Sequence, residues 1–338
     1  ISFQTFIITK LRKILKLMNY KPIIIVAGEP NSIFFEIFFK SIKKKYKSPI
    51  ILIGSYDVLR LQMKKLNFYK KINLIDIKNI KNCQINNNSI NLIDVEYKTL
   101  KAFEKISKKS KKYIEDCFKI AFKLINQGYT YKFINGPISK KNFLTRKNLG
   151  VTEYIANKFK IKKFAMLIYN KKLSVCPVTT HLPLKDVAKK INKTTILEKV
   201  KLINQFYIKN IGYKPSFAVT GINPHCESNS VYDQDQKVTS PAIKLLKKTG
   251  YKISGPYAAD TIFLKKNRKK FDVILGMYHD QVLTPIKTLF EYDAINITLG
   301  LKFLRISPDH GPNEKMLGKN KSNPLSLTKA LNFLDTRK

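Results

Sequence analysis

The sequence predicts a soluble α/β protein built from two lobes. Its 338 residues, 44% of them hydrophobic, can bury a large core, and this length suits two α/β lobes better than one compact domain. Short runs rich in Ile and Val alternate with longer, lysine-containing segments along the chain. Such an alternation of strand and helix patterns is typical of α/β folds.

The apolar runs are continuous, which is the pattern of strands that are buried on both faces of a mostly parallel sheet. We expect seven such strands, at Ile23 to Ala27, Ile50 to Gly54, Phe133 to Gly136, Phe164 to Tyr169, Phe217 to Gly221, Val273 to Met277 and Ala294 to Leu299.

Three segments between the strands have patterns of their own. Tyr113 to Asn126 places apolar residues at helical spacing, and Gly128 follows as a C-cap, so this segment predicts a helix. Residues 78–91, rich in Asn and Lys, predict a surface loop or an irregular β-excursion. The lysines of Ser107 to Lys112 predict a solvated, charged face.

The chain has a formal net charge of +41, because it contains 64 Lys and Arg residues but 23 Asp and Glu residues. This balance suggests nucleic acid or an anionic membrane surface as partners. The lysines are, however, spread through the chain together with Ile and Asn, so they raise the charge without marking one groove. We therefore expect no specific nucleic-acid partner, and a basic nucleic-acid-binding protein on a retained fold is a distant alternative.

Cysteine spacing and hydropathy predict a cytoplasmic protein. Four distant cysteines without a CxxC pair indicate neither a zinc ribbon nor a disulfide framework. No apolar run approaches the roughly 20 residues that span a bilayer, so we expect no membrane partner. Residues 1–17, basic and loosely amphipathic, predict an N-terminal extension outside the fold, because a β-branched strand begins soon after Met18.

The four histidines each lie within two residues of Pro, Asp or Gly, just beyond or near an apolar strand. Three follow a strand directly, since CPVTT leads into His181, FAVTGIN into Pro224 and His225, and VILGMY into His279. In open α/β sheets, ligands bind outside the carboxyl ends of the strands. Neutral imidazoles suit Zn²⁺ or Co²⁺, so one interpretation is a shared metal site, and the other is three unrelated turns.

Eight strings in order resemble the 4-hydroxythreonine-4-phosphate dehydrogenase family, from about Lys21 to the end of the chain. They are AGEP (27–30), NGPISK (135–140), GVTE (150–153), TTHLPLKD (179–186), GINPH (221–225), GPYAADTIF (255–263), MYHDQ (277–281) and NITLGLKFLRISPDHG (296–311).

The resemblance implies a divalent metal, Zn²⁺, Co²⁺ or Mg²⁺, held by His181, His225 and His279, with the last histidine contributed across a homodimer interface. It also implies that four further residues contact a small phosphorylated hydroxy-amino acid, namely Thr152, Lys287, Asn296 and Arg305. Lysine and arginine suit this role because both offer charge-assisted donors to phosphate and carboxylate.

The cofactor implied is NAD, with NADP possible. No GxGxxG phosphate loop occurs in the chain. Instead, His310, Gly311, Gly318 and Lys319 resemble the cofactor loop of the isocitrate and isopropylmalate dehydrogenase fold. A two-lobed α/β/α sandwich of that kind is therefore the fold that the resemblance implies. A glycine-containing loop that carries a lysine can surround a nucleotide with backbone donors.

The implied reaction is the oxidation of 4-phosphohydroxy-L-threonine in pyridoxal 5'-phosphate biosynthesis. A metal beside the secondary alcohol would stabilise the developing alkoxide while hydride passes to NAD. The resulting β-keto acid would lose CO₂ to give 3-amino-2-oxopropyl phosphate. Asp260 and Asp280 are candidates for the base or for orienting a ligating imidazole.

The chain departs from the family pattern at three places. Val151 stands where the family usually has histidine, GEPNSIFFE replaces a more glycine-rich turn, and Cys226 stands where Ala or Gly is usual. Val151 cannot donate to phosphate. A related dehydrogenase for 4-phospho-threonate or 4-phospho-erythronate is therefore the first alternative.

The predicted boundaries place residues 18–145 and 293–338 in the first lobe and residues 146–292 in the second. The active site is expected in the cleft between lobes and subunits.

Overall fold

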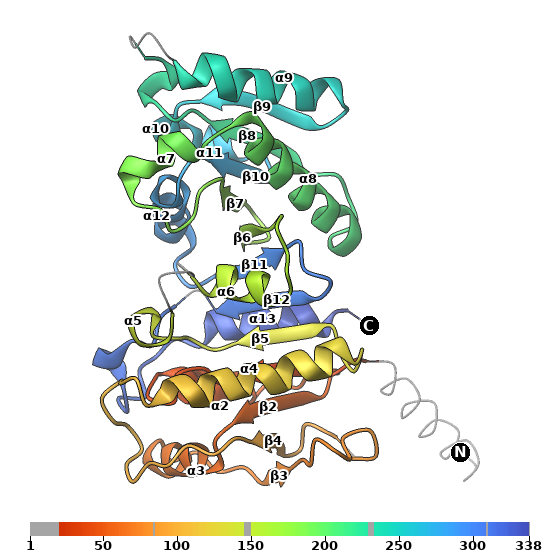
Figure 1. The fold of residues 1–338 in the computed structure, drawn as a ribbon, viewed down its shortest axis with the longest axis vertical. Coiled ribbons are helices and arrows are strands. Elements are labelled where there is room, and N and C mark those ends of the chain that lie inside the picture. The colour runs from red at the N-terminus through yellow and green to blue at the C-terminus, as the bar shows by residue number, and fades with distance from the viewer. Residues whose placement is uncertain (1–19, 84, 145–149, 229–232, 309, 338) are drawn as a thin grey trace, which may run out of the picture. The chain divides into compact units, whose positions relative to one another are not determined.

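A computed structural model describes residues 20–83, 85–144, 150–228, 233–308 and 310–337. The chain forms two compact units, called unit 1 (Ile1–Leu144 and Lys302–Lys338) and unit 2 (Thr145–Leu301). The predicted extension, residues 1–17, lies outside the described residues. Both units are drawn in Figure 1.

Unit 1 contains a parallel sheet of six strands. Its central strands are almost entirely Ile, Leu and Val and are fully buried, as expected for a sheet with helices on both faces. The strand order is β3 (Ile72–Leu74), β4 (Ile90–Asp94), β2 (Ile50–Gly54), β1 (Ile23–Val26), β5 (Lys132–Asn135) and β12 (Leu304–Pro308).

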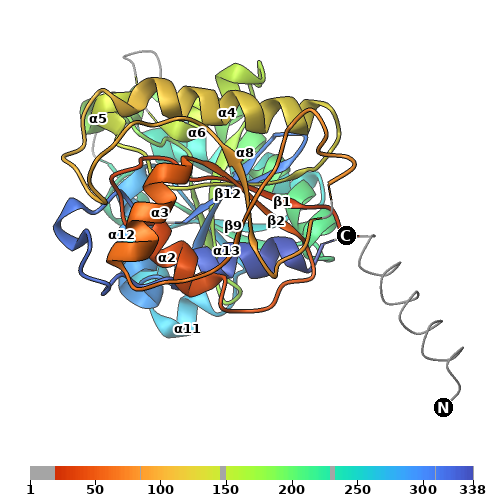
Figure 2. The ribbon, with the colours of Figure 1, turned by 90° about the horizontal axis from the view of Figure 1, so that it is seen from below.

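Helices cover both faces of this sheet. Helix α4 (Ser110–Asn126) packs on β1 and β2 from one side, and Figure 2 shows α2 (Phe34–Ser41), α3 (Tyr56–Lys65) and α13 (Leu325–Asp335) on the other. The α2 helix buries four phenylalanines against the sheet and its neighbours. The other helical segments described in unit 1 are α5 (Lys140–Phe143) and the 3₁₀ turn η3 (Glu314–Met316).

Unit 2 contains a mixed sheet of six strands. Four adjacent strands run parallel, whereas β6 is antiparallel to both of its neighbours. The order is β11 (Ile295–Leu299), β6 (Ala165–Tyr169), β7 (Ser174–Pro177), β10 (Val273–Gly276), β8 (Ser216–Thr220) and β9 (Lys252–Tyr257).

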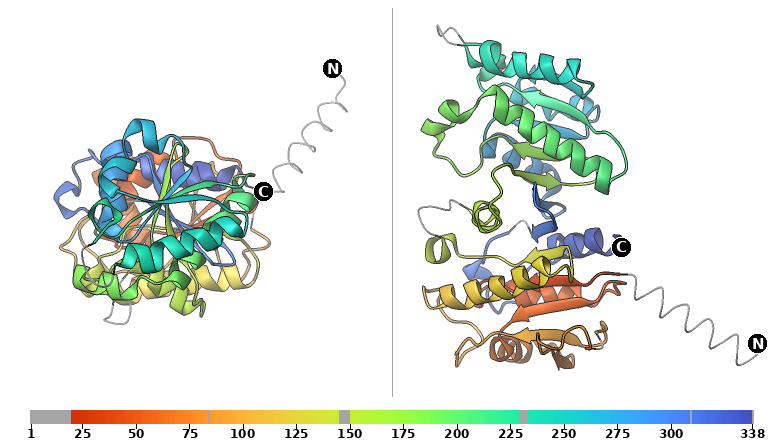
Figure 3. Two further views of the ribbon diagram at one scale, coloured as in Figure 1. Left: turned by 90° about the horizontal axis from the view of Figure 1, so that it is seen from above. Right: turned by 45° about the vertical axis from the view of Figure 1, so that its right-hand side comes forward.

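The core of unit 2 lies between this sheet and helix α12 (His279–Phe290). Ile274 of β10 and Val175 of β7 pack with Val282 and Ile286 of the helix. Figure 1 labels α12 and α8 (Lys193–Asn210) on opposite sides of the strands of unit 2, and Figure 3 shows the ribbon from two further directions. The other helices are α6 (Val151–Lys158), α7 (Leu184–Lys190), α8 (Lys193–Asn210), η1 (Pro224–Cys226), η2 (Asp235–Thr239), α9 (Ser240–Lys248), α10 (Ala259–Ile262) and α11 (Lys265–Arg268).

The predicted elements agree closely with the observed ones. Each of the seven predicted strands overlaps an observed strand, and the predicted helix is α4. Residues 78–91 are mainly turns, but β4 begins at Ile90. Ser110, predicted on a solvated face, is buried, because its hydroxyl donates to Glu29 Oε2 at 2.8 Å.

One boundary differs from the expectation. Residues 293–301 were assigned to the first lobe, whereas the structure places β11 in unit 2 because it pairs along its whole length with β6. No helix among the described residues has both the length and the apolar character needed to cross a membrane.

Lys132 gives unit 1 a pH-dependent stability. Its side chain is fully buried in β5, where Nζ donates to Ser48 Oγ at 3.0 Å and to the carbonyl oxygen of Arg337. Burial lowers the pKa of Lys132 to about 8, against the opposing effect of Asp335. The folded state therefore holds this proton less tightly than the unfolded chain does.

We predict that Lys132 makes unit 1 more stable as the pH rises from about 8 towards the usual lysine pKa of 10.5. In that window the unfolded chain binds more protons, so the free energy of unfolding rises by up to about 1.4 kcal/mol per pH unit. Urea unfolding of the native protein and of Lys132→Met, near pH 7.5 and near pH 9.5, measures this contribution. A difference between the two proteins that does not change with pH would contradict it, and exposed Lys81→Met is the control.

Candidate active site

Four candidate residues of unit 2 follow the carboxyl ends of four adjacent parallel strands. His181 follows β7, His279 follows β10, His225 follows β8 and Asp260 follows β9. Because parallel strands end at one edge of a sheet, the four exit turns are neighbours at that edge. The sheet therefore gathers polar residues that are up to 98 positions apart in the sequence (279 − 181 = 98).

His181 and His279 lie beside each other, with their ring centroids 5.6 Å apart. The exits of β7 and β10 are joined by backbone hydrogen bonds, from Val178 N to the Gly276 oxygen at 2.7 Å and from Thr179 N to the Met277 oxygen at 3.2 Å. The Thr179 hydroxyl donates to the same Met277 oxygen at 2.7 Å. These contacts fix the two histidine turns relative to each other.

Each of these two rings has a carboxylate at Nδ1. His181 Nδ1 lies 3.3 Å from Glu153 Oε1, and His279 Nδ1 lies 2.6 Å from Asp280 Oδ1. A carboxylate at Nδ1 favours the tautomer with the proton on that nitrogen, which leaves the Nε2 lone pair available for a metal. The donor set therefore fits a divalent ion such as Zn²⁺ or Co²⁺.

Glu153 is a site residue that the sequence reasoning did not single out, although it lies in the GVTE string. Its Oε1 also accepts a hydrogen bond from Thr180 Oγ1 at 2.7 Å. Burial alone would raise the pKa of Glu153, but the hydrogen bonds from His181 and Thr180 lower it to about 2. Glu153 is therefore an anion that orients the His181 ring.

Only glycine fits at position 150, because the backbone there lies in close contact with the side chains of Glu153 and His181. A Cβ atom at this position would lie 2.5 Å from Glu153 Oε2 and 2.6 Å from His181 Nδ1. Both neighbours are the orienting groups just described, so a side chain here would displace the ring. The glycine of the GVTE string thus has a packing role.

His225 lies in a separate turn. It is exposed, its backbone is left-handed (φ 56°), and Cys226 beside it is left-handed as well (φ 63°). The preceding residues are held by the buried carboxylate of Asp235, which accepts from Ile222 N at 2.9 Å and Asn223 N at 3.0 Å. In the described part of one chain, no group of three or more His, Cys, Asp or Glu residues is placed to hold a metal.

Gln281 connects the turns that carry His225 and His279. Its Oε1 accepts from Met277 N at 2.7 Å and from Thr220 Oγ1 at 2.8 Å, and its Nε2 donates to the Gly221 oxygen at 2.8 Å. The side-chain amide therefore joins the exits of β8 and β10. In the sequence, Gln281 was marked only as the last residue of the MYHDQ string.

The predicted acids differ in their surroundings. Asp280 lies in the first turn of α12 and binds the His279 ring, so the structure favours an orienting role. Asp260 is exposed in α10, and its charge acts on Cys226, the neighbour of His225. Burial raises the pKa of the Cys226 thiol, and the nearby carboxylates raise it further.

The predicted substrate residues of unit 2 are spread over three elements. Thr152 is buried in the first turn of α6, one residue before Glu153, whereas Lys287 is exposed in α12. Asn296 lies across from Ile168, which is paired with Val175. Asn296 is therefore level with the amino-terminal half of β7, whereas His181 follows its carboxyl end.

Unit 1 has a corresponding edge beyond β1, β5 and β12. A Cβ atom at Gly28 would lie 2.4 Å from the Pro137 oxygen, and one at Gly136 would lie 2.1 Å from the Ala27 oxygen. The AGEP and NGPISK turns therefore need glycine in order to pack together. Arg305, 2% exposed, donates from Nε to Asn135 Oδ1 at 2.8 Å next to this turn.

The GEPNSIFFE turn is held by hydrogen bonds of its own polar side chains. Asn31 Oδ1 accepts from Glu104 N at 2.8 Å, and the Ser32 hydroxyl donates to the Glu29 oxygen at 2.7 Å. Both side chains are buried, as is Glu29, whose pKa is raised by that burial. Polar side chains thus hold this turn.

The predicted cofactor residues lie in unit 1, in irregular chain after β12. His310 Nδ1 lies 3.0 Å from the Gly311 oxygen, Gly318 lies against the ring of Phe103, and Lys319 is exposed. Pro312 in the same stretch accepts a hydrogen bond from Ile33 N at 3.1 Å. This stretch therefore lies next to the AGEP turn.

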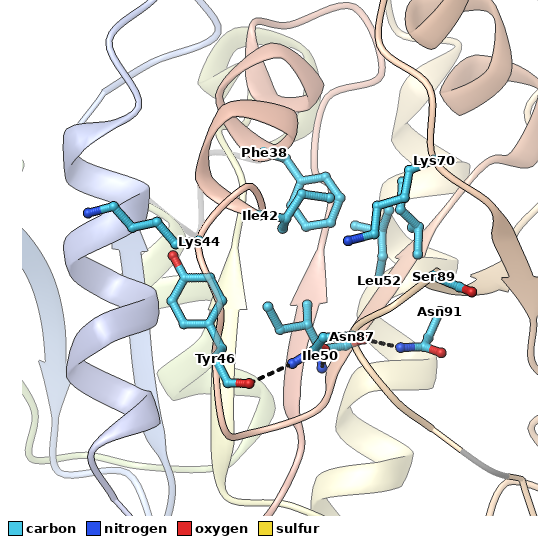
Figure 4. Close-up of a pocket in the computed structure, with 11 residues that line it drawn as sticks. Phe38, Ile42, Lys44, Tyr46, Ile50, Leu52, Lys70, Asn87, Ser89 and Asn91 are labelled. Carbon is cyan, nitrogen blue, oxygen red and sulfur yellow. Dashed lines mark hydrogen bonds between the residues drawn. The ribbon is translucent and has the colours of Figure 1, made fainter.

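A pocket elsewhere in unit 1 contains none of the predicted site residues. Figure 4 shows it between α2 and the amino-terminal ends of β2 and β4, with Phe38, Ile42 and Leu52 as its apolar part. The side-chain amide of Asn87 in its wall is already bonded to backbone atoms of Ile50, Tyr46 and Ser48. This pocket lies at the amino-terminal edge of the unit 1 sheet, opposite to the edge that carries the AGEP and NGPISK turns.

The chain is similar to known proteins over most of its length. The family model described as pyridoxal phosphate biosynthetic protein PdxA matches residues 45–334. A protein of Sulfurihydrogenibium sp. (strain YO3AOP1), 4-hydroxythreonine-4-phosphate dehydrogenase, is 37% identical over 315 residues, which are 91% of this chain and 95% of that protein. D-threonate 4-phosphate dehydrogenase of Salmonella typhimurium is 32% identical over 303 residues, 87% and 92% of the two chains.

Among solved structures, the chain is similar to 4-hydroxythreonine-4-phosphate dehydrogenase from Klebsiella pneumoniae. The TM-score is 0.77 at 26% sequence identity, over 93% of this chain and 98% of the other. This likeness confirms the predicted α/β fold class.

We predict that Gln281→Met lowers the free energy of unfolding by about 2–4 kcal/mol. The substitution removes three hydrogen bonds worth about 1 kcal/mol each and leaves part of their partners buried without a donor or acceptor. Urea unfolding measures the loss. Exposed Gln236→Met is the matched control, and equal stability of the two variants would show that Gln281 does not join the turns.

Proposed function

The chain belongs to the PdxA family of pyridoxal phosphate biosynthetic proteins, and from this premise we propose that it is an NAD-dependent and divalent-metal-dependent dehydrogenase. Its proposed reaction is the oxidation of 4-phosphohydroxy-L-threonine followed by loss of CO₂, which gives 3-amino-2-oxopropyl phosphate. The observation that carries the proposal is the pair of neighbouring imidazoles, His181 and His279, each with a carboxylate at Nδ1.

The metal would be held by His181, His225 and His279. When bound, a divalent ion supplies positive charge that stabilises the oxygen of the alcohol as it loses its proton. Glu153 and Asp280 orient two of the rings and thereby keep their Nε2 atoms directed away from the carboxylates. Because one chain brings two of the three histidines together, a homodimer in which a second copy completes the site suits the geometry.

Substrate binding is assigned to Thr152, Lys287, Asn296 and Arg305, whose chemistry suits a phosphorylated amino acid. Asn296 Oδ1 is buried and makes no hydrogen bond within the described residues, so it can accept one from a substrate. Lys287 and Arg305 offer cationic donors. With Asp280 engaged by His279, Asp260 is the remaining candidate for the base that takes the hydroxyl proton.

The nicotinamide cofactor is assigned to the stretch that includes His310, Gly311, Gly318 and Lys319. NAD is the first choice, and NADP is the other possibility. The family match favours an enzyme over the nucleic-acid-binding protein considered from the charge. We also propose a cytoplasmic location, with which four free cysteines are compatible.

A second candidate substrate is 4-phospho-D-threonate. The relatives include both a 4-hydroxythreonine-4-phosphate dehydrogenase and a D-threonate 4-phosphate dehydrogenase at comparable identity. Val151 favours this candidate, because its side chain cannot donate to phosphate as the usual histidine can.

We predict that the purified protein forms NADH from 4-phosphohydroxy-L-threonine. Chelation should abolish the reaction, and added Zn²⁺, Co²⁺ or Mg²⁺ should restore it, because the imidazoles alone cannot supply the charge that the metal provides. The measurement is absorbance of NADH, with 4-phospho-D-threonate and 4-phospho-D-erythronate assayed in parallel. A higher kcat/KM for either sugar acid would replace the proposed substrate, and no reduction of NAD or NADP with any of the three would contradict the proposed function.

Hybrid dimers decide how the metal site is shared. The family resemblance assigns His279 to the second subunit, whereas the short distance between the His181 and His279 rings of one chain supports an arrangement in which His225 crosses instead. If His279 crosses, a hybrid of His181→Ala and His279→Ala subunits keeps one intact site and regains activity, and the His181→Ala with His225→Ala hybrid does not. If His225 crosses, these two results are exchanged. Inactivity of both hybrids would contradict sharing.

A further inference from the structure

The cofactor segment, defined as residues 310–324, is attached to both ends of helix α2. At the amino-terminal end of the helix, Ile33 N donates to the Pro312 oxygen at 3.1 Å. At the carboxyl-terminal end, Lys40 Nζ donates to the Asn320 oxygen at 3.0 Å and to the Ser322 oxygen at 2.9 Å. The helix thus spans the segment and binds it at two separated points.

The second attachment is built around a buried carboxylate. Glu36 is 2% exposed, and its Oε1 accepts from Lys40 Nζ at 2.8 Å and from Ser322 N at 2.5 Å. Ser322 is itself buried. The carboxylate binds the backbone N–H of Ser322 while the ammonium binds two carbonyl oxygens, so the pair satisfies three backbone groups of the segment at once. Charge-assisted hydrogen bonds of this kind are stronger than neutral ones.

The segment has little regular structure of its own to define its conformation. Its one described helical turn is the three-residue η3, and Asn313 and Asn320 have left-handed backbones (φ 51° and 55°). Most of its side chains are exposed, so apolar burial contributes little to holding it. Its conformation is therefore set mainly by contacts with the rest of unit 1. At both ends of the segment, the polar contacts come from α2 and its N-cap residue.

We propose that the Glu36–Lys40 pair is a positioning device that holds the cofactor segment ready to bind the dinucleotide. The proposal rests on the assignment of NAD to this segment under the proposed function. When a loop must be ordered before it can bind, the apparent affinity equals the intrinsic affinity multiplied by the fraction of molecules in which the loop is already ordered. By ordering residues 320–322 in the free protein, the pair raises that fraction without touching the cofactor.

The test is Lys40→Met, with Lys40→Arg as the conservative replacement and exposed Lys43→Met as the control. We expect Lys40→Met to raise the KM for NAD roughly tenfold, while kcat and the KM for the phosphorylated substrate stay within about twofold. Lys40→Arg should restore most of the NAD affinity, since arginine also donates to carbonyl oxygens. Because a solitary buried Glu36 could unfold the unit, the double variant Glu36→Gln, Lys40→Met is measured in parallel and should show the same selective change.

Hydrogen exchange provides a readout that does not depend on activity. Peptides that cover residues 316–323 should exchange faster in Lys40→Met and in the double variant than in the native protein or Lys43→Met. Unchanged exchange, or an equal rise of KM for both substrates, overturns the positioning role. Failure of the native protein to bind NAD overturns the proposed function and the cofactor role together, and the exchange result then still decides whether the pair orders the segment.

Discussion

The candidate site depends on the position of β10 between β7 and β8. Parallel pairing on both sides brings the exits of these strands to one edge, and a histidine stands in each exit. The backbone bonds from Val178 and Thr179 join one pair of exits, and the Gln281 amide joins the other. If β10 were displaced by one strand, no local motif could restore the arrangement, because the histidines are far apart in the sequence.

Carboxylates determine what the gathered imidazoles can do. A histidine at the edge of a sheet can present either nitrogen, and Glu153 and Asp280 select Nδ1 for hydrogen bonding. The selection leaves Nε2 for a metal. The close approach of Gly150 to the His181 ring shows that the backbone of α6 also belongs to this arrangement.

In unit 1, close backbone packing and side-chain hydrogen bonds hold the AGEP and NGPISK turns at the edge of the sheet. Its turns pack so closely that Gly28 and Gly136 leave no room for a side chain, whereas the neighbouring Asn31 and Ser32 fill their positions with buried hydrogen bonds. Close packing at the glycines and side-chain hydrogen bonds at Asn31 and Ser32 therefore act together at this edge.

The sequence alone determined the strands with long runs of Ile, Leu and Val and the histidines that follow three of them, because apolar continuity and strand exits are local properties. It did not reveal β3, β4, β9 or β12, whose residues mix polar and apolar types, or the place of β11 beside β6. Glu153 was also missed, since its role appears only when α6 approaches the turn of His181. Strand order and ring contacts are long-range relations, and only the tertiary structure could decide them.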